Sequence, residues 1–303
     1  MNEYPPPLST VDDLSSLLHL PADELIRIAE RASQCYRIRK KKKTNGGFRV
    51  YRIPGDELKK VQKLIHRKLL SHFPVHESIY SYRRKRDTVK SALLHVRASV
   101  LVQLDIKDFF PSIRPNRVYE MFIQRGCADS VATVLTKLTT CDNQLPQGPP
   151  TSPGIANQIL TPLARRFSGV CEQHGLKMST FGDDFYVSGT NRAAQVKNLF
   201  VRIIEDEEFA IKPEKTVVSR PGQRKIVAGI SVNTKINIPK DKYKKIRAIL
   251  HNASVRGFHD LFPNLNESKA RSRLRGMIGY VSKLNHAKGE QLKKKFMSIT
   301  GRC

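Results

Sequence analysis

Several features that would narrow the function of this protein are missing from its sequence. There is no tryptophan, and the five cysteines never occur as Cys-x-x-Cys; they stand at Cys35, Cys127, Cys141, Cys171 and Cys303. Scattered cysteines in odd number argue against a disulfide framework and against a zinc module. We therefore expect neither structural feature.

Long apolar runs are also missing. Arg, Lys, His or Asp interrupts every hydrophobic stretch before it reaches the length that crosses a bilayer. The first ten residues, MNEYPPPLST, lack the basic and apolar regions of a secretory signal. We expect a cytoplasmic protein that makes no membrane contact.

Acidic residues are scarce relative to basic ones. The sequence has 54 Lys and Arg against 27 Asp and Glu, a net charge of +27. Repulsion between so many positive charges opposes compact folding unless an anionic partner neutralises them. Nucleic acid is the usual partner, because Lys and Arg displace the counterions condensed on phosphates. The basic residues concentrate at 37–49 and at 240–303, where 16 Lys and Arg face four Asp and Glu.

The remaining pattern predicts a mixture of helices and strands. Helices are expected at 9–31, broken at Pro21, and at 56–71, 115–125, 151–170 and along the tail. Hairpins are expected at 36–53, turning at Asn45-Gly46-Gly47, and at 180–188. A buried strand is expected at 100–106, and a small antiparallel pair at 226–232 and 236–238. Without regular βαβ alternation, the fold class is α+β.

Two carboxylate sites stand out within apolar surroundings. Asp105 ends the apolar run at 100–104, and Asp183-Asp184 lies at the tip of a hairpin flanked by aromatic residues. Buried carboxylates are costly unless a cation compensates them. Two divalent metals held by a few carboxylates serve in-line phosphoryl transfer. A turn or capping role is the alternative for a lone Asp, and the three together favour the metal site.

The surrounding motifs resemble those of bacterial reverse transcriptases, in order and in spacing. The similar segments are KKTNGGFR at 42–49, LDIKDFFPSI at 104–113, LPQGPPTSPGIAN at 145–157, FGDD at 181–184, PEKT at 213–216 and VAGISVN at 227–233. The resemblance implies a right-hand polymerase with fingers, a palm built on an antiparallel sheet, and a helical thumb. It also implies an RNA-directed DNA polymerase whose substrates are dNTPs and an RNA–DNA hybrid.

The resemblance implies a metal-dependent catalytic centre. Asp105 and Asp183 would ligate two Mg²⁺ ions, with Mn²⁺ as an alternative, and the Ile106 carbonyl would be a further ligand. Asp184 would support the site. The residues expected to contact the nucleotide are Lys42, Lys43, Arg49, Phe110, Gln147, Gly148 and Lys215. Phe110 would lie under the sugar and exclude a 2′-hydroxyl, and Lys215 would contact phosphate or protonate pyrophosphate.

Nucleic-acid contacts are expected along the hairpin and the thumb. The residues are Phe181, Gly229, Arg271, Arg273 and Arg275, with Gly276 and Gly279 allowing a close approach of backbone to phosphate. A solvated basic helix is the alternative for the thumb. Phe181 replaces the usual Tyr of the family and thereby removes one hydroxyl.

Two further segments resemble the signatures of retron reverse transcriptases. Ser91, Ala92 and His95 match Asn-Ala-x-x-His with Ser in place of Asn, and Val227, Ala228 and Gly229 match Val-Thr-Gly with Ala in place of Thr. The retron family primes on an RNA 2′-hydroxyl of its own structured noncoding RNA. Its members commonly act with an effector protein in phage defence. We assign these six residues to RNA specificity.

The expected division of the chain has four parts. Residues 1–35 are an N-terminal helical segment, 36–99 the fingers, 100–235 the palm with interleaved fingers elements, and 236–303 the basic thumb. This length leaves no room for an RNase H or integrase domain. Whether the N-terminal segment packs on the palm or binds a partner stays open.

Three alternatives remain. An RNA-dependent RNA polymerase also carries Gly-Asp-Asp, but usually has a second Asp where Phe110 stands here. A catalytically silent RNA-binding protein is disfavoured by the three aspartates. Another bacterial defence reverse transcriptase that uses no retron RNA remains open because of Ser91 and Ala228.

Overall fold

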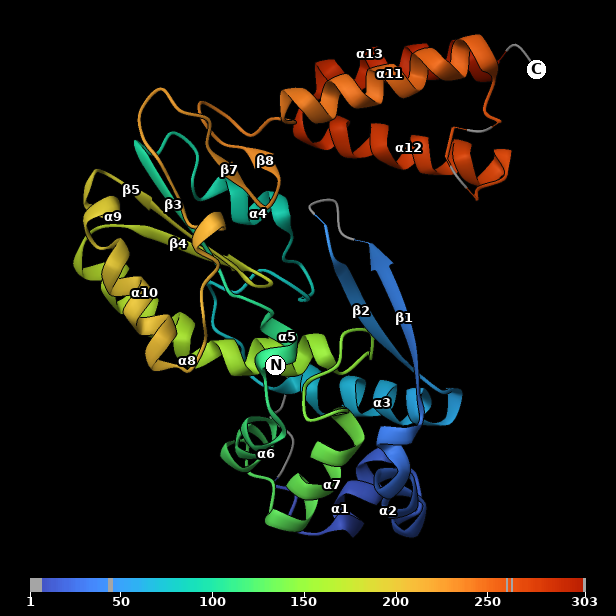
Figure 1. Cartoon of the computed structure of the whole chain (residues 1–303), viewed down its shortest axis with the longest axis vertical. Helices are drawn as coiled ribbons and strands as arrows, with labels where there is room; N and C mark the ends of the chain where they lie inside the picture. The colour runs from blue at the N-terminus through green and yellow to red at the C-terminus, as the bar shows by residue number, and fades with distance from the viewer. Residues whose placement is uncertain (1–6, 43–45, 260, 263, 302–303) are drawn as a thin grey trace.

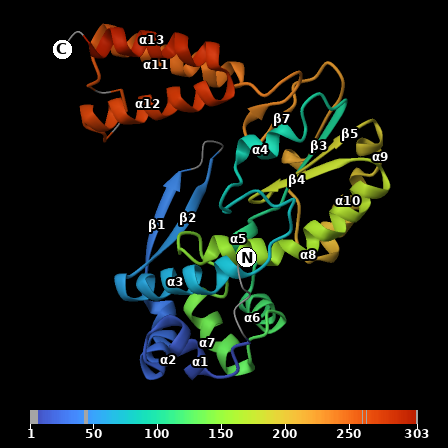
Figure 2. The same cartoon turned by 180° about the vertical axis from the view of Figure 1, so that it is seen from behind.

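The structure, a computed structural model, describes residues 7–42, 46–259, 261–262 and 264–301 and confirms the α+β class. Three parts follow one another from bottom to top in Figure 1: helices that carry a long hairpin, a sheet with helices packed on it, and a helical bundle. They correspond to the fingers, palm and thumb of a right-hand polymerase. Figure 2 shows the same three parts from behind.

The N-terminal helices pack into the fingers. Pro21 separates α1 (Val11–Leu18) from α2 (Ala22–Arg31), as the sequence predicts. Their buried leucine and isoleucine side chains join the core that also contains α3 (Asp56–Lys68) and α7 (Asp129–Thr139), and both of these helices touch α1 and α2. The N-terminal segment thus packs in the fingers core, whereas the sequence left open whether it packs on the palm or binds a partner.

The predicted basic hairpin is present. Strands β1 (Tyr36–Lys42) and β2 (Phe48–Pro54) pair antiparallel along their whole length. Gly46 and Gly47 have φ values of +86° and +72°, as the turn prediction requires, whereas Asn45 lies outside the described residues. The hairpin projects from the helices toward the thumb (Figure 1), which leaves its side chains largely exposed.

The palm is an antiparallel sheet of four strands in the order β4-β5-β3-β6. The strands are β3 (Val100–Asp105), β4 (Lys177–Phe181), β5 (Asp184–Gly189) and β6 (Val217–Ser219). Phe185 on one face packs against Phe167 of α8 (Ser152–Gln173), which in turn packs against Phe200 of α10 (Lys197–Asp206). Leu101 and Tyr186 on the other face join a second core, which includes α4 (Thr88–Leu93) and the thumb. Helices on both faces explain why β3 is apolar almost throughout.

The thumb is a bundle of α11 (Lys240–Arg256), α12 (Glu267–Leu284) and α13 (His286–Thr300). Leu250, Leu274, Ile278 and Leu292 form its interior, and the basic side chains lie mostly outside. Asn266 and Asn285 cap α12 and α13 through their side chains.

One predicted strand is wrong in its extent. Residues 226–232 fold back on themselves as β7 (Ile226–Val227) and β8 (Ile230–Ser231), joined through Ala228 and Gly229. Both turn residues have positive φ, as a two-residue type I′ turn requires. Pairing with 236–238 is reduced to a bridge between Ser231 and Asn237.

Several elements were not predicted from the sequence. Strand β6 and helices α4, α5 (Phe109–Ser112) and α9 (Arg192–Gln195) are short, whereas α7 and α10 have apolar residues at helical spacing and could have been predicted. The helix predicted at 115–125 is α6 (Pro115–Gln124). Within the described parts of the chain, no helix combines the length and apolar character needed to cross a membrane.

Candidate active site

The predicted catalytic aspartates come together at one end of the palm sheet. Asp105 is the last residue of β3, and its strand position is directly opposite Asp184 at the start of β5. Asp183 lies in the turn between β4 and β5, where Gly182 has a φ of +67° that favours glycine. The Ile106 amide donates to the Asp183 carbonyl over 3.1 Å. The sheet register therefore places all three carboxylates at one point.

These carboxylates lie in an environment that disfavours their charge. Burial first, and then the charge of Asp105, raise the pKa of Asp183. Burial and the neighbouring Asp183 raise the pKa of Asp184 to about 6, although Gln103 Nε2 donates to its Oδ1 over 3.1 Å. Asp105 is only 2% exposed. Buried acidic groups that raise one another's pKa form a site that a cation would stabilise.

Two lysines of the loop before β6 neutralise Asp105. Lys212 Nζ lies 2.9 Å from Asp105 Oδ1, and Lys215 Nζ lies 3.0 Å from Oδ2. Lys212 Nζ also approaches the carbonyl of Ile106, at 3.4 Å. The structure thus places Lys215, predicted to contact phosphate, on a carboxylate, and it adds Lys212, which the sequence reading missed. The Lys-x-x-Lys spacing around Pro213-Glu214 was the available signal.

The donor set fits an open site for a hard divalent cation. Among the described residues there is no group of three His, Cys, Asp or Glu side chains placed to hold a metal by themselves. Asp105 and Asp183 would provide one carboxylate each, and a main-chain carbonyl adjoins them at Ile106. Mg²⁺ is usually held by one or two carboxylates and by substrate phosphates, because it keeps much of its hydration.

A pocket of about 340 Å³ opens beside Asp183 and collects most of the predicted nucleotide contacts. Arg49 from β2 and Phe110 line it, together with Gln147 and Gly148 of the loop before α8. The four were predicted from three separate motifs, and the fold brings them together. Lys42, at the exposed end of β1, does not line this pocket, and Lys43 lies outside the described residues.

The two adjacent phenylalanines differ in their surroundings. Asp108 has a φ of +43° and turns the chain into the short helix α5, so Phe109 and Phe110 lie on a helical turn and not on a strand. Phe109 is buried against Phe209, whereas Phe110 is half-buried and lines the pocket. The two rings meet edge to face, 5.5 Å apart. Because successive residues of a helical turn point in different directions, Phe109 faces the core and Phe110 faces the pocket.

Gly148 holds the pocket loop against the hairpin. The Arg52 amide donates to the Gln147 carbonyl over 2.8 Å, which ties β2 to this loop. Gly148 has a φ of +128°, and a Cβ at this position would lie 2.8 Å from the Arg52 carbonyl oxygen. Only glycine fits without moving one of the two segments.

We expect Gly148→Ala to raise the KM for dNTP about tenfold or more, because displaced pocket walls misplace the reacting atoms. Steady-state primer extension with varied dNTP measures this change. Gly169→Ala on α8 is the matched control, since a Cβ there meets nothing within 4 Å and helix interiors tolerate alanine. An unchanged KM in Gly148→Ala would contradict the assigned role.

The residues assigned to RNA specificity at 91–95 are buried. Ser91, Ala92 and His95 are each 0% exposed. His95 Nδ1 lies 2.7 Å from the Ser188 hydroxyl and its Nε2 lies 2.8 Å from the Ser179 hydroxyl, which also contacts Ser91 Oγ at 2.8 Å. This network joins the α4 segment to β4 and β5, the strands that carry the catalytic hairpin. Direct contact of these side chains with RNA is therefore excluded in this conformation.

Burial, and secondarily the charge of Lys177, lower the pKa of His95 to about 3. Above pH 6.5 both the folded and unfolded states keep this histidine neutral, whereas below it only the unfolded state takes up the proton. We therefore expect the free energy of unfolding to fall by about 1.4 kcal/mol between pH 7.5 and 5.5 from this residue alone. Urea unfolding of the unaltered chain and of His95→Gln at both pH values tests this; an equal pH dependence in the two would contradict it.

The turn residues of the other retron-like segment differ in exposure. Val227 is buried, while Ala228 and Gly229 are half-buried and lie beside the thumb. Lys242 of α11 points its Nζ at Gly229, 3.0 Å from where a Cβ would be. This turn is thus placed where the palm sheet meets the thumb.

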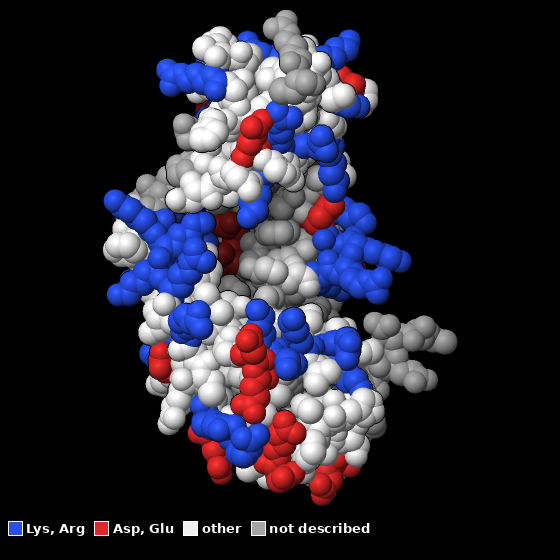
Figure 3. Space-filling view, turned by 90° about the vertical axis from the view of Figure 1, so that its right-hand side faces the viewer, with Lys and Arg blue, Asp and Glu red and all other residues white. Residues whose placement is uncertain are grey.

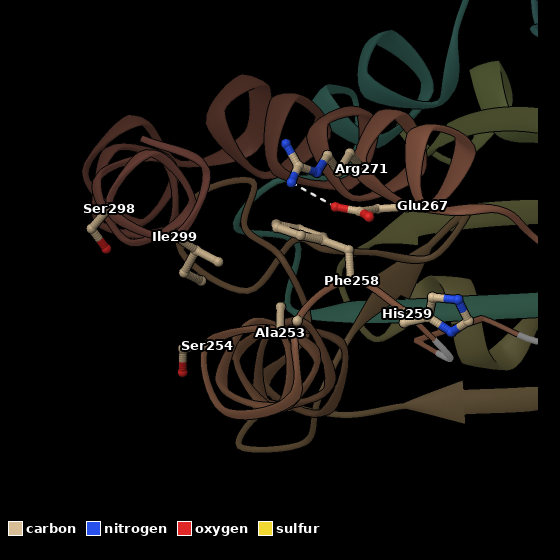
Figure 4. A pocket seen from close by; sticks show the side chains of 9 residues that line it. Ala253, Ser254, Phe258, His259, Glu267, Arg271, Ser298 and Ile299 are labelled. Atoms are coloured by element: carbon tan, nitrogen blue, oxygen red, sulfur yellow. Dashed lines mark hydrogen bonds and ion pairs between the residues drawn. The ribbon is translucent and has the colours of Figure 1, made fainter. Parts of the chain in front are cut away.

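The thumb arginines have partners within the thumb. Arg271 contacts Glu267 at 2.6 Å, and its guanidinium lies 4.6 Å from the centre of the Phe258 ring, inside a pocket shared with Ser298 (Figure 4). Arg273 and Arg275 are exposed and lie over the rings of Phe262 and Phe296. A phosphate would have to compete with Glu267 for Arg271, whereas Arg273 and Arg275 remain accessible.

Basic side chains flank the catalytic end of the palm. Figure 3 shows a hollow with acidic side chains at its floor and Lys and Arg on both sides. Gly276 and Gly279 of α12 leave open space above their backbone, since a Cβ at either position meets nothing within 4 Å. Phe181 is half-buried against the second core. A polyanion placed in this hollow would meet charges of the opposite sign on both walls.

Comparison with known proteins identifies the family. The sequence profile of the reverse transcriptase (RNA-dependent DNA polymerase) family matches residues 38–228. The retron Ec86 reverse transcriptase of Escherichia coli is 29% identical over 299 residues, which cover 94% of this chain and 92% of that protein. The retron Mx65 reverse transcriptase of Myxococcus xanthus is 30% identical over 273 residues, which cover 84% of this chain and 62% of that protein.

Solved structures support the fold alone, because their sequence identities are low. A telomerase from Candida albicans has a TM-score of 0.54 and 10% identity, with 91% of this chain and 58% of that chain covered. A foamy viral protease-reverse transcriptase has a TM-score of 0.50 and 13% identity, with 88% and 43% covered. With the right-hand fold and the aspartates in place, the chain belongs to the reverse transcriptase family of RNA-dependent DNA polymerases, and within it resembles the retron enzymes of bacteria.

Proposed function

We propose that this chain copies part of its own structured noncoding RNA into a short single-stranded DNA in the bacterial cytoplasm. Synthesis would be primed from an RNA 2′-hydroxyl, and the product would serve phage defence together with an effector protein. The observation that carries the polymerase role is the pocket that joins Asp183 to Phe110, Gln147 and Arg49. The retron similarity over 94% of the chain supports the specific RNA substrate.

Reverse transcriptases generally use divalent metal ions, and two Mg²⁺ ions are proposed here. Asp105 and Asp183 would hold them, with the Ile106 carbonyl as a further ligand and Asp184 supporting the site through Gln103. Bound there, such ions would lower the pKa of the primer hydroxyl and stabilise the charge that develops on the transferred phosphate. Mn²⁺ is the proposed substitute, since it also prefers oxygen ligands.

The protein's own groups would bind and orient the nucleotide. Arg49 can form two hydrogen bonds to the triphosphate, and Lys42 and Lys43 would add positive charge near it. Phe110 would support the sugar, while Gln147 and Gly148 would lie against the base pair. Lys212 and Lys215 both contact Asp105, and we propose that Lys215, the more exposed of the two, also contacts the phosphates of the nucleotide.

The nucleic acid would lie in the hollow between hairpin, palm and thumb. Phe181 and Gly229 border it from the palm, and Arg273 and Arg275 would contact phosphates from the thumb, with Arg271 contributing if it leaves Glu267. The proposed boundaries at residues 99/100 and 235/236 follow these roles, whereas the boundary at 35/36 separates two parts of the fingers, because the helices before it pack in the fingers core. For 91–95, we propose that RNA specificity is indirect, because the network of His95 sets the position of the catalytic strands.

The test is to purify the chain from its native host and to sequence the nucleic acid that accompanies it. A short DNA joined through a 2′,5′ linkage to one structured RNA is the expected result. Recovery of heterogeneous or unlinked DNA would overturn the retron assignment while preserving the polymerase. Recovery of RNA products copied from RNA would instead favour an RNA-dependent RNA polymerase.

A further inference from the structure

Tyr82 is an aromatic residue that no motif singled out. It is 54% exposed, although a tyrosine ring would gain from burial, and its φ of +55° is unusual for a bulky residue. Exposed aromatic rings on a strained backbone persist when the surrounding structure imposes them, and such residues cluster at functional sites.

Hydrogen bonds fix the backbone immediately before Tyr82. Asn157 of α8 donates from Nδ2 to the Ser81 carbonyl over 2.9 Å, and its Oδ1 accepts from the Ser81 hydroxyl over 3.2 Å. Thr180 of β4 exchanges main-chain hydrogen bonds with Ser78 and Tyr80 at 2.8 Å and 3.0 Å. The segment that carries Tyr82 is thus bonded to the strand that leads into the catalytic turn.

Arg83 completes this support. Its Nη1 donates to the carbonyls of His76 and Ile79 at 2.9 Å and 3.0 Å. The three anchors, from α8, from β4 and from within the segment, keep Tyr82 in place relative to Asp183. The conformation is therefore preorganised before any ligand binds.

The ring and hydroxyl of Tyr82 both face the reaction site. The residue lines the same pocket as Arg49, Phe110 and Asp183. A Cβ placed on Gly182 would lie 3.8 Å from the Tyr82 hydroxyl oxygen. The hydroxyl thus lies beside the turn whose first residue, Phe181, lacks the hydroxyl that the family usually carries there.

We propose that Tyr82 binds the primer-terminal nucleotide, with its hydroxyl donating a hydrogen bond to an oxygen of that nucleotide and its ring forming one wall of the dNTP pocket. The inference rests on the proposed polymerase function. The primer hydroxyl must reach the phosphate near Asp105 and Asp183, so the terminal nucleotide passes beside Gly182. Tyr82 supplies a donor there, from the fingers rather than from the hairpin itself.

The test is single-nucleotide extension of a DNA primer annealed to an RNA template, with the full-length chain and Mg²⁺. Tyr82→Phe should lower kcat about tenfold, the size expected for one lost hydrogen bond, with the KM for dNTP within about twofold. Tyr82→Ala should lower kcat similarly and also raise the KM for dNTP severalfold, because the pocket loses a wall.

Tyr80→Phe is the matched control. Tyr80 lies on the same anchored segment, but it is buried and its ring contacts Arg86 rather than the pocket. Its kcat should stay within about twofold of the unaltered chain. An unchanged kcat in Tyr82→Phe, or an equal loss in Tyr80→Phe, would overturn the inference while leaving the polymerase assignment intact. If the unaltered chain makes no DNA, the inference on Tyr82 and the proposed polymerase function are both wrong.

Discussion

Asp183→Asn is expected to reduce DNA synthesis at least about a thousandfold in kcat, because the site loses a carboxylate that would hold a catalytic cation. The same change should not unfold the protein. Burial and Asp105 raise the pKa of Asp183, so its charge opposes folding at neutral pH, and a neutral amide of the same shape relieves this cost. Primer extension and thermal unfolding of the same preparation measure the two effects, and Tm should rise slightly.

Asp206→Asn separates this effect from a general loss of negative charge. Asp206 lies on α10, where it is exposed and paired with Arg166 at 2.6 Å. Exposed pairs of this kind contribute little to stability, so synthesis and Tm should both be nearly unchanged. If Asp183→Asn kept synthesis within tenfold of the unaltered chain, the metal assignment would be wrong.

The stability gain expected from Asp183→Asn distinguishes this residue from Asp105. Asp105 is more deeply buried, but Lys212 and Lys215 compensate its charge, so removing that carboxylate leaves two ammonium groups without their partner. The loss falls mainly on Lys212, whose side chain is 18% exposed, because Lys215 at 47% exposure can be solvated; leaving a largely buried charge without its partner is destabilising. Inactivity of an Asp105 variant alone would therefore not separate loss of chemistry from loss of structure.

Much of the fold could be predicted because its apolar periods are local. Patterns that extend over only a few residues predict helices α1, α2, α3, α6 and α8. Similar local patterns predict the basic hairpin and the hairpin that carries Asp183. The extent of the strand at 226–232 could not be predicted, because it depends on Ala228 adopting a positive φ that alanine rarely adopts. The short helix α5 was hidden for the same reason, by the positive φ of Asp108.

The site likewise contains residues that the sequence predicts and residues that it does not. Asp105, Asp183 and the Gln147-Gly148 pair lie in motifs, so their sequence context was sufficient. Lys212 acquires its position through its contact with β3, and Tyr82 through the hydrogen bonds of its neighbour Ser81 to Asn157, so both depend on distant segments. The burial of His95 also depends on two serines more than 80 residues away. Apart from the Lys-x-x-Lys spacing of Lys212 and Lys215, the sequence pattern of a single segment contains no information on such partners.

Because Phe110 lines the pocket beside Asp183, we propose that its ring determines the choice of sugar. Its ring lines the pocket that contains Asp183 and meets Phe109 edge to face, and Phe109 in turn packs on Phe209. These contacts would restrict movement of the ring when a larger sugar enters. A 2′-hydroxyl would therefore meet the ring edge, whereas a deoxyribose would not.

Phe110→Ala should accordingly reduce the preference for dNTP over rNTP about a hundredfold, expressed as the ratio of their kcat/KM values. The gain should lie in rNTP incorporation, with dNTP incorporation falling only severalfold. Because Phe110 is half-buried, its removal should cost less stability than the several kcal/mol expected for a fully buried ring. Primer extension with matched dNTP and rNTP measures the ratio.

Phe110→Tyr is the control that keeps an aromatic ring at this position of the pocket. It retains the ring and its contact with Phe109, so sugar preference should remain within a few fold of the unaltered chain. Loss of preference in both variants would point to general disorder of the pocket, which the KM for dNTP would also report. No change in sugar preference in Phe110→Ala would remove the steric argument against an RNA-dependent RNA polymerase, because that argument depends on this ring alone.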